Sequence, residues 1–301
     1  MRSRYAPDRQ LTVRMLTVVF LLGLLYVAFV AALIALLKSV ALVVVIAGGL
    51  LAVQYWYSDK IALFAMHAHE VTPQDQPYLH GAVDRLCAIA DMPKPRIALS
   101  EMDLPNAFAA GRNADRAVLC VTTGLLRRLE REELEGVLAH ELSHVAHRDV
   151  AVITIASFLG VLAGLMVRFA FYSELFGGRG RRDQNTVLLV AGVLVVSAAV
   201  YVLSFLLIRT LSRYRELAAD RSAAQLTGRP SALASALIKV SGDIARIPTK
   251  DLRTAQAFNA FFFTPALNQE AGLANLFSTH PTLQRRLDAL AKLSARLGES
   301  T

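Results

Sequence analysis

His140-Glu141-Leu142-Ser143-His144 is the stretch around which the rest of the chain is organised. Apolar residues recur around it at helical spacing and predict one amphipathic helix; they are Leu134, Val137, Leu138, Leu142 and Val145. His140 and His144 stand four residues apart on one face of that helix, where two imidazoles can converge on a metal ion. Glu141 leaves to one side of the pair, so its carboxylate can meet a water at the metal without binding the metal itself. This chemistry is typical of zinc-activated peptide hydrolysis; the alternative is a surface helix with two unrelated histidines and a solvated glutamate.

The composition favours a membrane protein with soluble parts. Of the 301 residues, 54% are hydrophobic, and the formal net charge is +8, a combination that is unusual for a soluble protein. Lysine and arginine cluster beside apolar runs and do not alternate with aromatic residues, so the sequence has no nucleic-acid-binding pattern. Cys87 and Cys120 lack a Cys-x-x-Cys spacing and are expected to be small buried side chains in a reducing compartment.

The N-terminal part predicts a transmembrane hairpin. Residues 15–37 carry no charge and exceed the roughly 20 residues that a helix needs to cross a bilayer. Lys38 and Ser39 form a minimal turn, and a second apolar run, residues 40–57, ends in aromatic residues suited to the headgroup boundary. A cleavable signal peptide is the alternative, but the run is too long and no Ala-x-Ala site follows it. Arginines at positions 2, 4, 9 and 14 place the N-terminus, and hence the segment after the hairpin, on the cytoplasmic side.

Residues 58–149 are soluble in character. They predict a helix at residues 74–90 and short strands at residues 96–99, 106–111 and 117–122, with a polar turn before the last strand. The helix that carries the two histidines follows this small sheet.

A second membrane hairpin is predicted over residues 150–208. Residues 150–167 and 186–208 are uncharged, and each is long enough to cross a bilayer. Three arginines lie in the loop at residues 177–182 between the two runs, against the tendency of basic residues to stay inside. A buried or re-entrant hairpin is therefore the alternative. From residue 209 the chain is polar and predicts short helices, the last of them amphipathic over residues 283–297.

A catalytic zinc site needs three protein ligands and one open position, and Glu216 is the best candidate for the third ligand. Residues 212–220 predict a helix that continues the fourth apolar run, with Glu216 and Asp220 on one face. The intervening hairpin brings its two ends together, which explains the long separation between His144 and Glu216.

The other histidines are weaker candidates. His147 lies seven residues from His140 on the same helix, roughly 10 Å along the axis, which is too far for both to hold one ion through bonds near 2 Å. We expect His147 to act as a cation at the helix C-terminus. His67 and His69 follow the second apolar run and have no partner cluster, and His80 is expected on a helix surface.

These segments together resemble the HtpX-like integral membrane zinc metalloproteases, which are relatives of the type 1 CAAX prenyl proteases. The resemblance covers nearly the whole chain, because the motifs occur in the family's order. They are a membrane hairpin, Asn-Ala-Phe-Ala-x-Gly at residues 106–111, Thr-Thr-Gly-Leu-Leu at 122–126, the His-Glu-x-x-His helix, a second hairpin, Glu-x-x-Ala-Asp at 216–220 and Ser-Thr-His-Pro at 278–281. Thr282 departs from the pattern, since many members have a second proline there, but it lies outside the metal site.

The resemblance implies that His140, His144 and Glu216 bind one zinc ion per chain and that Glu141 is the catalytic acid and base. Asp220 would orient a ligand histidine, with an ordinary surface aspartate as the alternative.

The resemblance also implies residues on the substrate side of the site. An extended peptide could add to the edge of the sheet at Asn106, Ala107, Phe108 and Ala109; an ordinary strand is the alternative. His280 and Arg286 match family positions, and both a place in the cleft and a structural role stay open for them.

The expected fold is a mainly α-helical membrane protein with about four transmembrane helices and a zincin-like α+β cytoplasmic catalytic domain that contains a small β-sheet. Its expected parts are an N-terminal membrane hairpin at residues 1–57, a first catalytic part with the sheet and the motif helix at 58–149, a second hairpin at 150–208 and a second catalytic part at 209–301.

The expected function is that of a zinc endopeptidase of the prokaryotic inner membrane, active on the cytoplasmic side. Its expected partners are the lipid bilayer and protein substrates, namely misfolded or damaged membrane proteins and unfolded proteins, as in stress-related quality control. One alternative is a protease that processes prenylated proteins, although four apolar runs are few to enclose the larger chamber it would need. The other is a catalytically silent membrane adaptor, which the presence of three ligands and the glutamate disfavours.

Overall fold

A computed structural model describes residues 9–147, 184–246 and 281–298. The chain divides into two compact units. The helical unit comprises Thr12–Trp56 and Val152–Leu211, and the α/β unit comprises Met1–Leu11, Tyr57–Ala151 and Ser212–Thr301.

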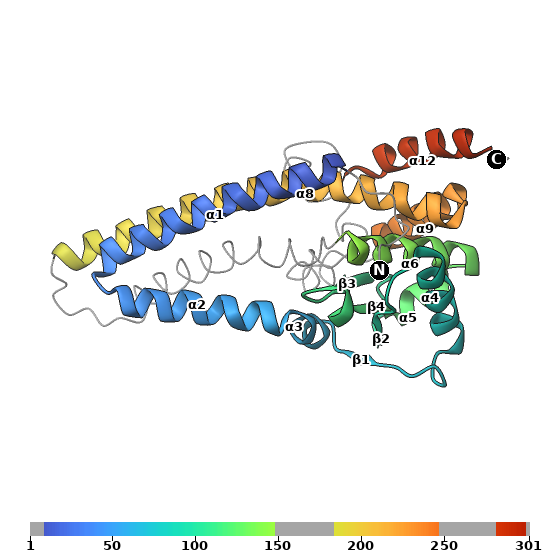
Figure 1. Ribbon diagram of the computed structural model, residues 1–301, viewed down its shortest axis with the longest axis horizontal. Coiled ribbons are helices and arrows are strands. Elements are labelled where there is room, and N and C mark those ends of the chain that lie inside the picture. Colours follow the sequence, from blue (N-terminus) through green and yellow to red (C-terminus); the bar gives the residue numbers. More distant parts are fainter. Residues whose placement is uncertain (1–8, 148–183, 247–280, 299–301) are drawn as a thin grey trace. The chain divides into compact units, whose positions relative to one another are not determined.

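The helical unit is formed by α1 (Arg9–Leu37), α2 (Val40–Trp56) and the first part of α8 (Gln184–Thr227) (Figure 1). Lys38, at a φ of 53°, and Ser39 make the predicted two-residue turn between α1 and α2. Apolar side chains of all three helices pack together, among them Val18, Leu22, Phe29, Leu33, Val43, Ala47, Val193 and Val200. Many other valines and leucines of these helices are exposed, which is a surface suited to lipid.

Two of the described helices are long and apolar enough to cross a membrane. The segments are Arg9–Ala35 in α1 and Val190–Thr227 in α8, and α2 contributes a shorter apolar helix, Val43–Trp56. The predicted run at residues 150–167 lies outside the described residues, so the second hairpin stays a prediction in that part. α8 is one helix of 44 residues, so the segment that carries Glu216 directly continues an apolar run, as predicted.

The α/β unit is built on a four-stranded mixed sheet in the order β1-β2-β4-β3. β2 (Arg96–Ser100) and β4 (Val118–Thr122) are parallel neighbours in the centre, and β1 (Ala68–Glu70) and β3 (Ala107–Ala110) pair antiparallel at the two edges. The three predicted strands are confirmed within two residues at each end. β1 is only three residues long and was not predicted from the sequence.

Helices cover both faces of the sheet. The helices described in this unit are α3 (Ser58–Ala65), α4 (Pro77–Ala90), α5 (Thr123–Arg128), α6 (Arg131–Ala146), the end of α8, α9 (Pro230–Arg246) and α12 (Leu283–Leu297). Of these, α3, α5 and α6 contact the strands directly, whereas α9 packs on α6 and α12 packs on α9. Successive side chains of a strand point to opposite faces, so Leu119 and Val121 enter the main core beside α4, α6 and α9. Val118 and Cys120 enter a smaller cluster beneath α3. Cys87 and Cys120 are both buried and form no disulfide, as predicted.

Candidate active site

Helix α6 carries both motif histidines, as predicted, but it is not a half-exposed amphipathic helix. Every residue from Gly136 to Val145 is buried, because α4, α9 and β3 pack around this helix and Glu216 of α8 faces His140. The alternative of a surface helix with a solvated glutamate is therefore wrong.

The first turn of α6 is tied to α9 through Glu133. Its Oε2 accepts a hydrogen bond from the N–H of Glu130 at 2.9 Å, and its Oε1 accepts one from Ser235 at 2.6 Å and lies 2.7 Å from Nζ of Lys239. Burial alone would raise the pKa of Glu133, but these hydrogen bonds lower it below its usual value. Gly136 permits the close contact one turn later, since a Cβ there would lie 3.3 Å from the backbone of Leu233 on α9.

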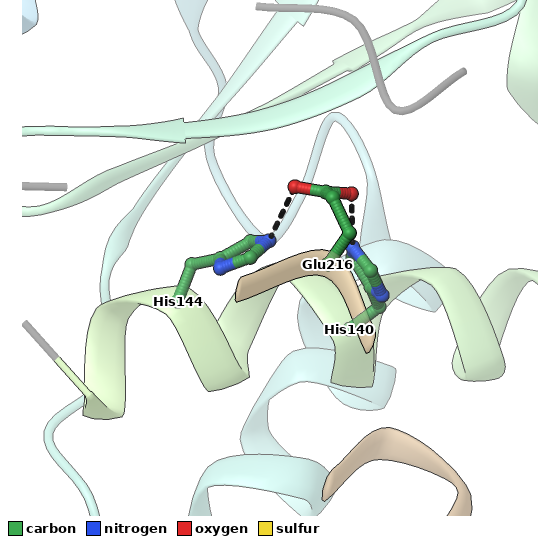
Figure 2. A group of neighbouring side chains, drawn as sticks. All are labelled: His140, His144 and Glu216. Atoms are coloured by element: carbon green, nitrogen blue, oxygen red, sulfur yellow. Dashed lines mark ion pairs between the residues drawn. The ribbon is translucent and has the colours of Figure 1, made fainter. Parts of the chain in front are cut away.

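Two helices bring the predicted metal ligands together. His140 and His144 project from α6 toward Glu216 of α8, whose two carboxylate oxygens each face one imidazole (Figure 2). Nε2 of His140 lies 3.5 Å from Oε2 of Glu216, and Nε2 of His144 lies 3.6 Å from Oε1. The two rings are perpendicular, with centroids 4.9 Å apart. All three side chains are buried.

The separations fit a single zinc ion. Ligand atoms bound at about 2.0–2.2 Å to a tetrahedral ion lie roughly 3.3–3.6 Å from one another. Each imidazole lies at such a distance, 3.5 or 3.6 Å, from a different oxygen of the Glu216 carboxylate. The three ligand atoms all lie within 4.8 Å of one another. Two imidazoles and one carboxylate are also a donor set that catalytic zinc takes.

Asp220, one turn beyond Glu216, lies behind His140. Its Oδ1 is 2.9 Å from Nδ1 of His140. Arg286 of α12 donates to both oxygens of the same carboxylate, from Nε to Oδ2 at 2.8 Å and from Nη2 to Oδ1 at 2.6 Å. Both Asp220 and Arg286 are buried, so a chain of charged groups connects the C-terminal helix to the motif histidine.

The local charges favour a cation where the three ligands meet. Burial alone would lower the pKa of His140, but hydrogen bonds with Asp220 and Glu216 raise it to about 9. Burial would likewise raise the pKa of Asp220, yet the charge of Arg286 lowers it below its usual value. The carboxylates thus outweigh desolvation and stabilise positive charge at this point.

Glu141 lies between the two histidines in sequence and is buried with them. Burial raises the pKa of its carboxyl to about 7. A carboxyl with a pKa in this range can both take and return a proton near neutral pH.

The remaining histidines do not join the cluster. Among the described residues, His140, His144 and Glu216 form the one group of at least three potential ligands. His147 is the C-terminal cap of α6, with Nδ1 2.8 Å from the carbonyl of Ser143. The expectation that His80 lies on a helix surface is wrong, because the side chain is buried and its Nε2 lies 3.0 Å from the carbonyl of Val71. His280 lies outside the described residues.

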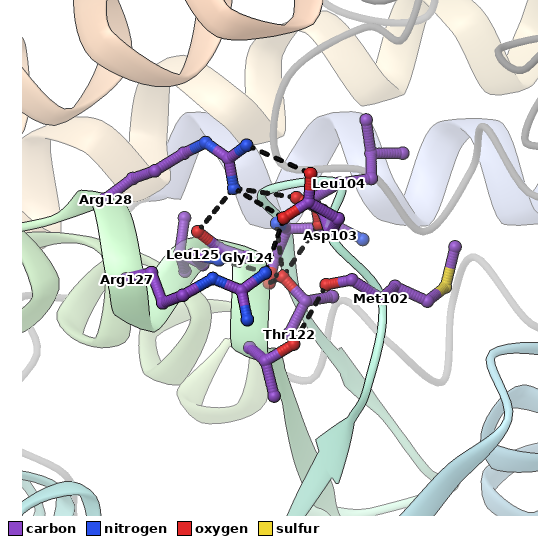
Figure 3. A network of polar contacts seen from close by, with 10 residues as sticks. Met102, Asp103, Leu104, Thr122, Gly124, Leu125, Arg127 and Arg128 are labelled. Atoms are coloured by element: carbon purple, nitrogen blue, oxygen red, sulfur yellow. Dashed lines mark hydrogen bonds and ion pairs between the residues drawn. The ribbon is translucent and has the colours of Figure 1, made fainter.

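The edge strand β3, which includes Ala107, Phe108 and Ala109, packs against α6. The loop before it is held by a set of contacts that we call the Thr122 clamp, formed by Thr122, Gly124 and Arg128 (Figure 3). Oγ1 of Thr122 accepts the N–H of Asn106 at 2.9 Å and donates to the carbonyl of Leu104 at 2.8 Å. The same hydroxyl accepts the N–H of Leu125 at 3.2 Å and so caps α5.

The other two clamp residues hold Met102 and Asp103. The N–H of Gly124 donates to the carbonyl of Met102 at 2.9 Å, and Nη1 of Arg128 donates to the carbonyl of Asp103 at 2.8 Å. A Cβ on Gly124 would lie 2.0 Å from the Asp103 carbonyl oxygen, so only glycine permits this approach. Arg127 adds an exposed ion pair with Asp103.

Arg215 was not among the residues predicted for the site. It is buried next to Glu216 on α8, and its Nη2 lies 3.4 Å from Nδ1 of His144. The sequence indicated a role for Arg215 only through its position next to Glu216. An arginine in a basic run gives no reason to expect burial.

The fold and this site define a metallopeptidase that combines a His-Glu-x-x-His helix with a glutamate from a second helix. Residues 73–294 match the model of "Peptidase family M48". The chain is 71% identical to "Protease HtpX homolog 1" of Streptomyces coelicolor over 100% of this chain and 98% of that protein. It is 50% identical to "Protease HtpX homolog" of Moorella thermoacetica over 99% of each chain. The chain therefore belongs to peptidase family M48, with the HtpX proteases as similar relatives.

A solved structure supports the same fold. The crystal structure of S. mikatae Ste24p matches with a TM-score of 0.55 over 93% of this chain and 65% of that one. The identity is 19%, so this likeness supports a Ste24-like fold and nothing finer.

Proposed function

We propose that the protein is a membrane-bound zinc endopeptidase in which His140, His144 and Glu216 hold one zinc ion. The observation that carries the proposal is the convergence of three buried ligand atoms from α6 and α8 within 4.8 Å. Membership of a metallopeptidase family supports the same site and favours an enzyme over a silent adaptor.

The residues around the ligands have separate tasks in this proposal. When bound, zinc would supply Lewis-acid chemistry that acidifies water and polarises the substrate carbonyl. Glu141 takes the proton of the attacking water at its carboxylate and passes it to the leaving amine. Asp220 keeps a proton on Nδ1 of His140 and so leaves Nε2 available as a ligand.

The substrate would bind along β3. This strand ends the sheet order β1-β2-β4-β3 and pairs with β4 on one side, so its other edge can hydrogen-bond an extended peptide backbone. β3 also packs on α6, the helix that carries two ligands. Asn106, Ala107, Phe108 and Ala109 are therefore the residues proposed to align the peptide.

We further propose that the substrates are misfolded or damaged membrane proteins and unfolded proteins at the cytoplasmic face of a prokaryotic inner membrane. The two long apolar helices support a membrane location, and basic residues near the N-terminus support the orientation. Processing of prenylated proteins is the second candidate, because the sequence motifs also resemble those of the type 1 CAAX prenyl proteases.

The decisive test compares wild-type protein with Glu141→Gln in detergent. We expect zinc near one ion per chain in both proteins and cleavage of unfolded casein by the wild type alone, because the substitution removes the base and leaves the ligands. His144→Ala is the matched control and should lose both zinc and cleavage. A wild type that binds no zinc and cleaves nothing would favour the adaptor, and a preference for a farnesylated CAAX peptide over casein would favour prenyl-protein processing.

The same proposal includes four membrane spans. It divides the chain into two hairpins and two catalytic parts, with boundaries near residues 57, 149 and 208. A single cysteine at Gly178 tests it in oriented vesicles, since two spans in the second hairpin place this position outside. Labelling of that cysteine only from the cytoplasmic side would mean that the second hairpin does not cross the membrane, and it would contradict the four-span arrangement.

A further inference from the structure

Helix α3 is held firmly on one side by the sheet. Ala62 and the capping residue Met66 are buried in the cluster that contains Ala98 and Phe108. Asp59 pairs with Arg96 of β2, whose Nη1 also lies 2.5 Å from Oε1 of Glu70. Helix packing and the ion pair therefore fix which face of α3 points away from the sheet.

The outward face is apolar and aromatic with one cation. Tyr57, Lys60, Ile61 and Phe64 recur at the spacing of one helical stripe, which we call the α3 stripe. Phe64 is 85% exposed, Tyr57 50% and Ile61 46%. Lys60 lies over the ring of Tyr57, with Nζ 5.5 Å from the ring centroid. Several exposed apolar side chains along one stripe, unlike a single exposed residue, indicate a partner outside the chain.

The chain directly before α3 indicates which partner this is. Only Tyr57 separates α3 from the end of α2, and α2 has exposed apolar side chains along its length, namely Val40, Val44, Val45, Ile46, Leu50 and Val53. α2 ends in Tyr55 and Trp56, whose rings contact edge to face, and such rings gather at the headgroup boundary of a bilayer. The α3 stripe thus directly follows, along the chain, a helix whose surface is suited to lipid.

We propose that α3 is an interfacial helix whose stripe rests in the headgroup boundary of the bilayer and so attaches the α/β unit to the membrane surface. Phe64 and Ile61 insert between lipids, Tyr57 places its hydroxyl toward water, and Lys60 extends its ammonium to lipid phosphates. This inference rests on the proposed membrane location and does not depend on the zinc site.

The test uses the full-length chain in vesicles of phosphatidylethanolamine and phosphatidylglycerol, with a spin label on one introduced cysteine. Phe64→Cys reports on the stripe. Ile89→Cys on α4, 44% exposed in the same unit, is the soluble control, and Val45→Cys on α2 is the lipid reference. The native thiols are buried, and burial raises the pKa of Cys87 to about 11 and that of Cys120 to about 12, so they compete little for the label.

The readout is the ratio of label accessibility to oxygen, which concentrates in lipid, and to a water-soluble nickel chelate. We expect a several-fold higher ratio at position 64 than at position 89, with position 45 higher still. A ratio at position 64 equal to that at position 89, with position 45 lipid-exposed, would overturn the interfacial helix but not the membrane location. Water exposure at all three positions would overturn the membrane location as well.

Contact with a second copy of the chain is the competing outcome. It would give a label at position 64 that neither reagent reaches and that broadens by dipolar coupling as the protein is concentrated, and this result would also overturn the proposal. A urea-unfolding midpoint in detergent equal to that of the wild type confirms that each labelled protein remains folded, and this check does not require the proposed activity.

Discussion

Oδ1 of Asp220 lies 2.9 Å from Nδ1 of His140, on the opposite side of the ring from the nitrogen that faces Glu216. A neutral imidazole carries one proton, and the nitrogen that binds a metal must be the unprotonated one. The carboxylate therefore selects the tautomer with the proton on Nδ1 and directs Nε2 toward Glu216.

Asp220→Ala should weaken zinc binding by about 10–100-fold, the usual effect of removing a hydrogen-bond partner of a ligand histidine. Asp220→Asn keeps an acceptor for the Nδ1 proton but loses the negative charge, so its effect should be smaller. Competition with a fluorescent zinc chelator measures both affinities. Equal affinity of wild type and Asp220→Ala would show that His140 needs no such partner.

Arg286→Met should lower the free energy of unfolding by about 3–5 kcal/mol, because it leaves the buried carboxylate of Asp220 without its counter-charge. The double variant Asp220→Ala/Arg286→Met removes both charges and should be more stable than Arg286→Met alone. Urea unfolding in detergent gives the double-mutant cycle. Additive losses from the two substitutions would mean that the pair acts independently, against the geometry.

Helices and strands were predicted from the sequence more accurately than the burial of individual side chains. Period, spacing and Gly or Pro positions correctly identified α2, β2 and β4, because these signals arise within a few neighbouring residues. The prediction that His80 lies on the surface was wrong, because a polar side chain can be buried once a hydrogen-bond partner is available. Such a partner, the carbonyl of Val71, comes from a separate turn of the chain.

The site was predictable where a motif encodes it and not where the fold creates it. The His-Glu-x-x-His spacing brings two candidate metal ligands to one face of any helix, and the continuity of α8 supports Glu216 as the third candidate. The contact of Arg286 with Asp220 joins α12 to α8 across 66 residues of sequence, and no local periodicity reports such a pairing. The interface between α6 and α9 through Gly136 is equally a product of packing.

Gly124→Ala should be among the most destabilising single-methyl additions in the chain. The new Cβ would fall 2.0 Å from the Asp103 carbonyl oxygen, so the loop before β3 must move, at a cost of about 2 kcal/mol or more. Gly81→Ala on α4 is the control, because a Cβ there meets nothing within 4 Å and should stabilise the helix by about 0.5–1 kcal/mol. Opposite shifts in Tm are expected; a neutral Gly124→Ala would contradict the close approach of the loop to α5.

Thr122→Val tests whether the Thr122 clamp positions β3 for substrate. The substitution keeps the shape but removes the hydroxyl that bonds Asn106, Leu104 and Leu125. We expect KM for an extended peptide to rise several-fold while zinc content is unchanged, with the larger effect on KM than on kcat. Thr122→Ser restores the hydroxyl and should recover KM. An unchanged KM in Thr122→Val would limit the clamp to a structural role.

The link between α6 and α9 should depend on pH through Glu133. Its folded-state pKa lies below the unfolded value of 4.5, since hydrogen bonds from Ser235, Lys239 and the Glu130 backbone outweigh burial. A lowered carboxyl pKa contributes stability above the unfolded pKa, and this contribution is lost as the pH falls through the folded value. Glu133→Gln should therefore cost about 1–2 kcal/mol at pH 7 and progressively less below pH 4.5. Urea unfolding of both proteins across this range measures the difference, and a gap that stays constant or widens toward acid would show that Glu133 is not stabilised as the charged form.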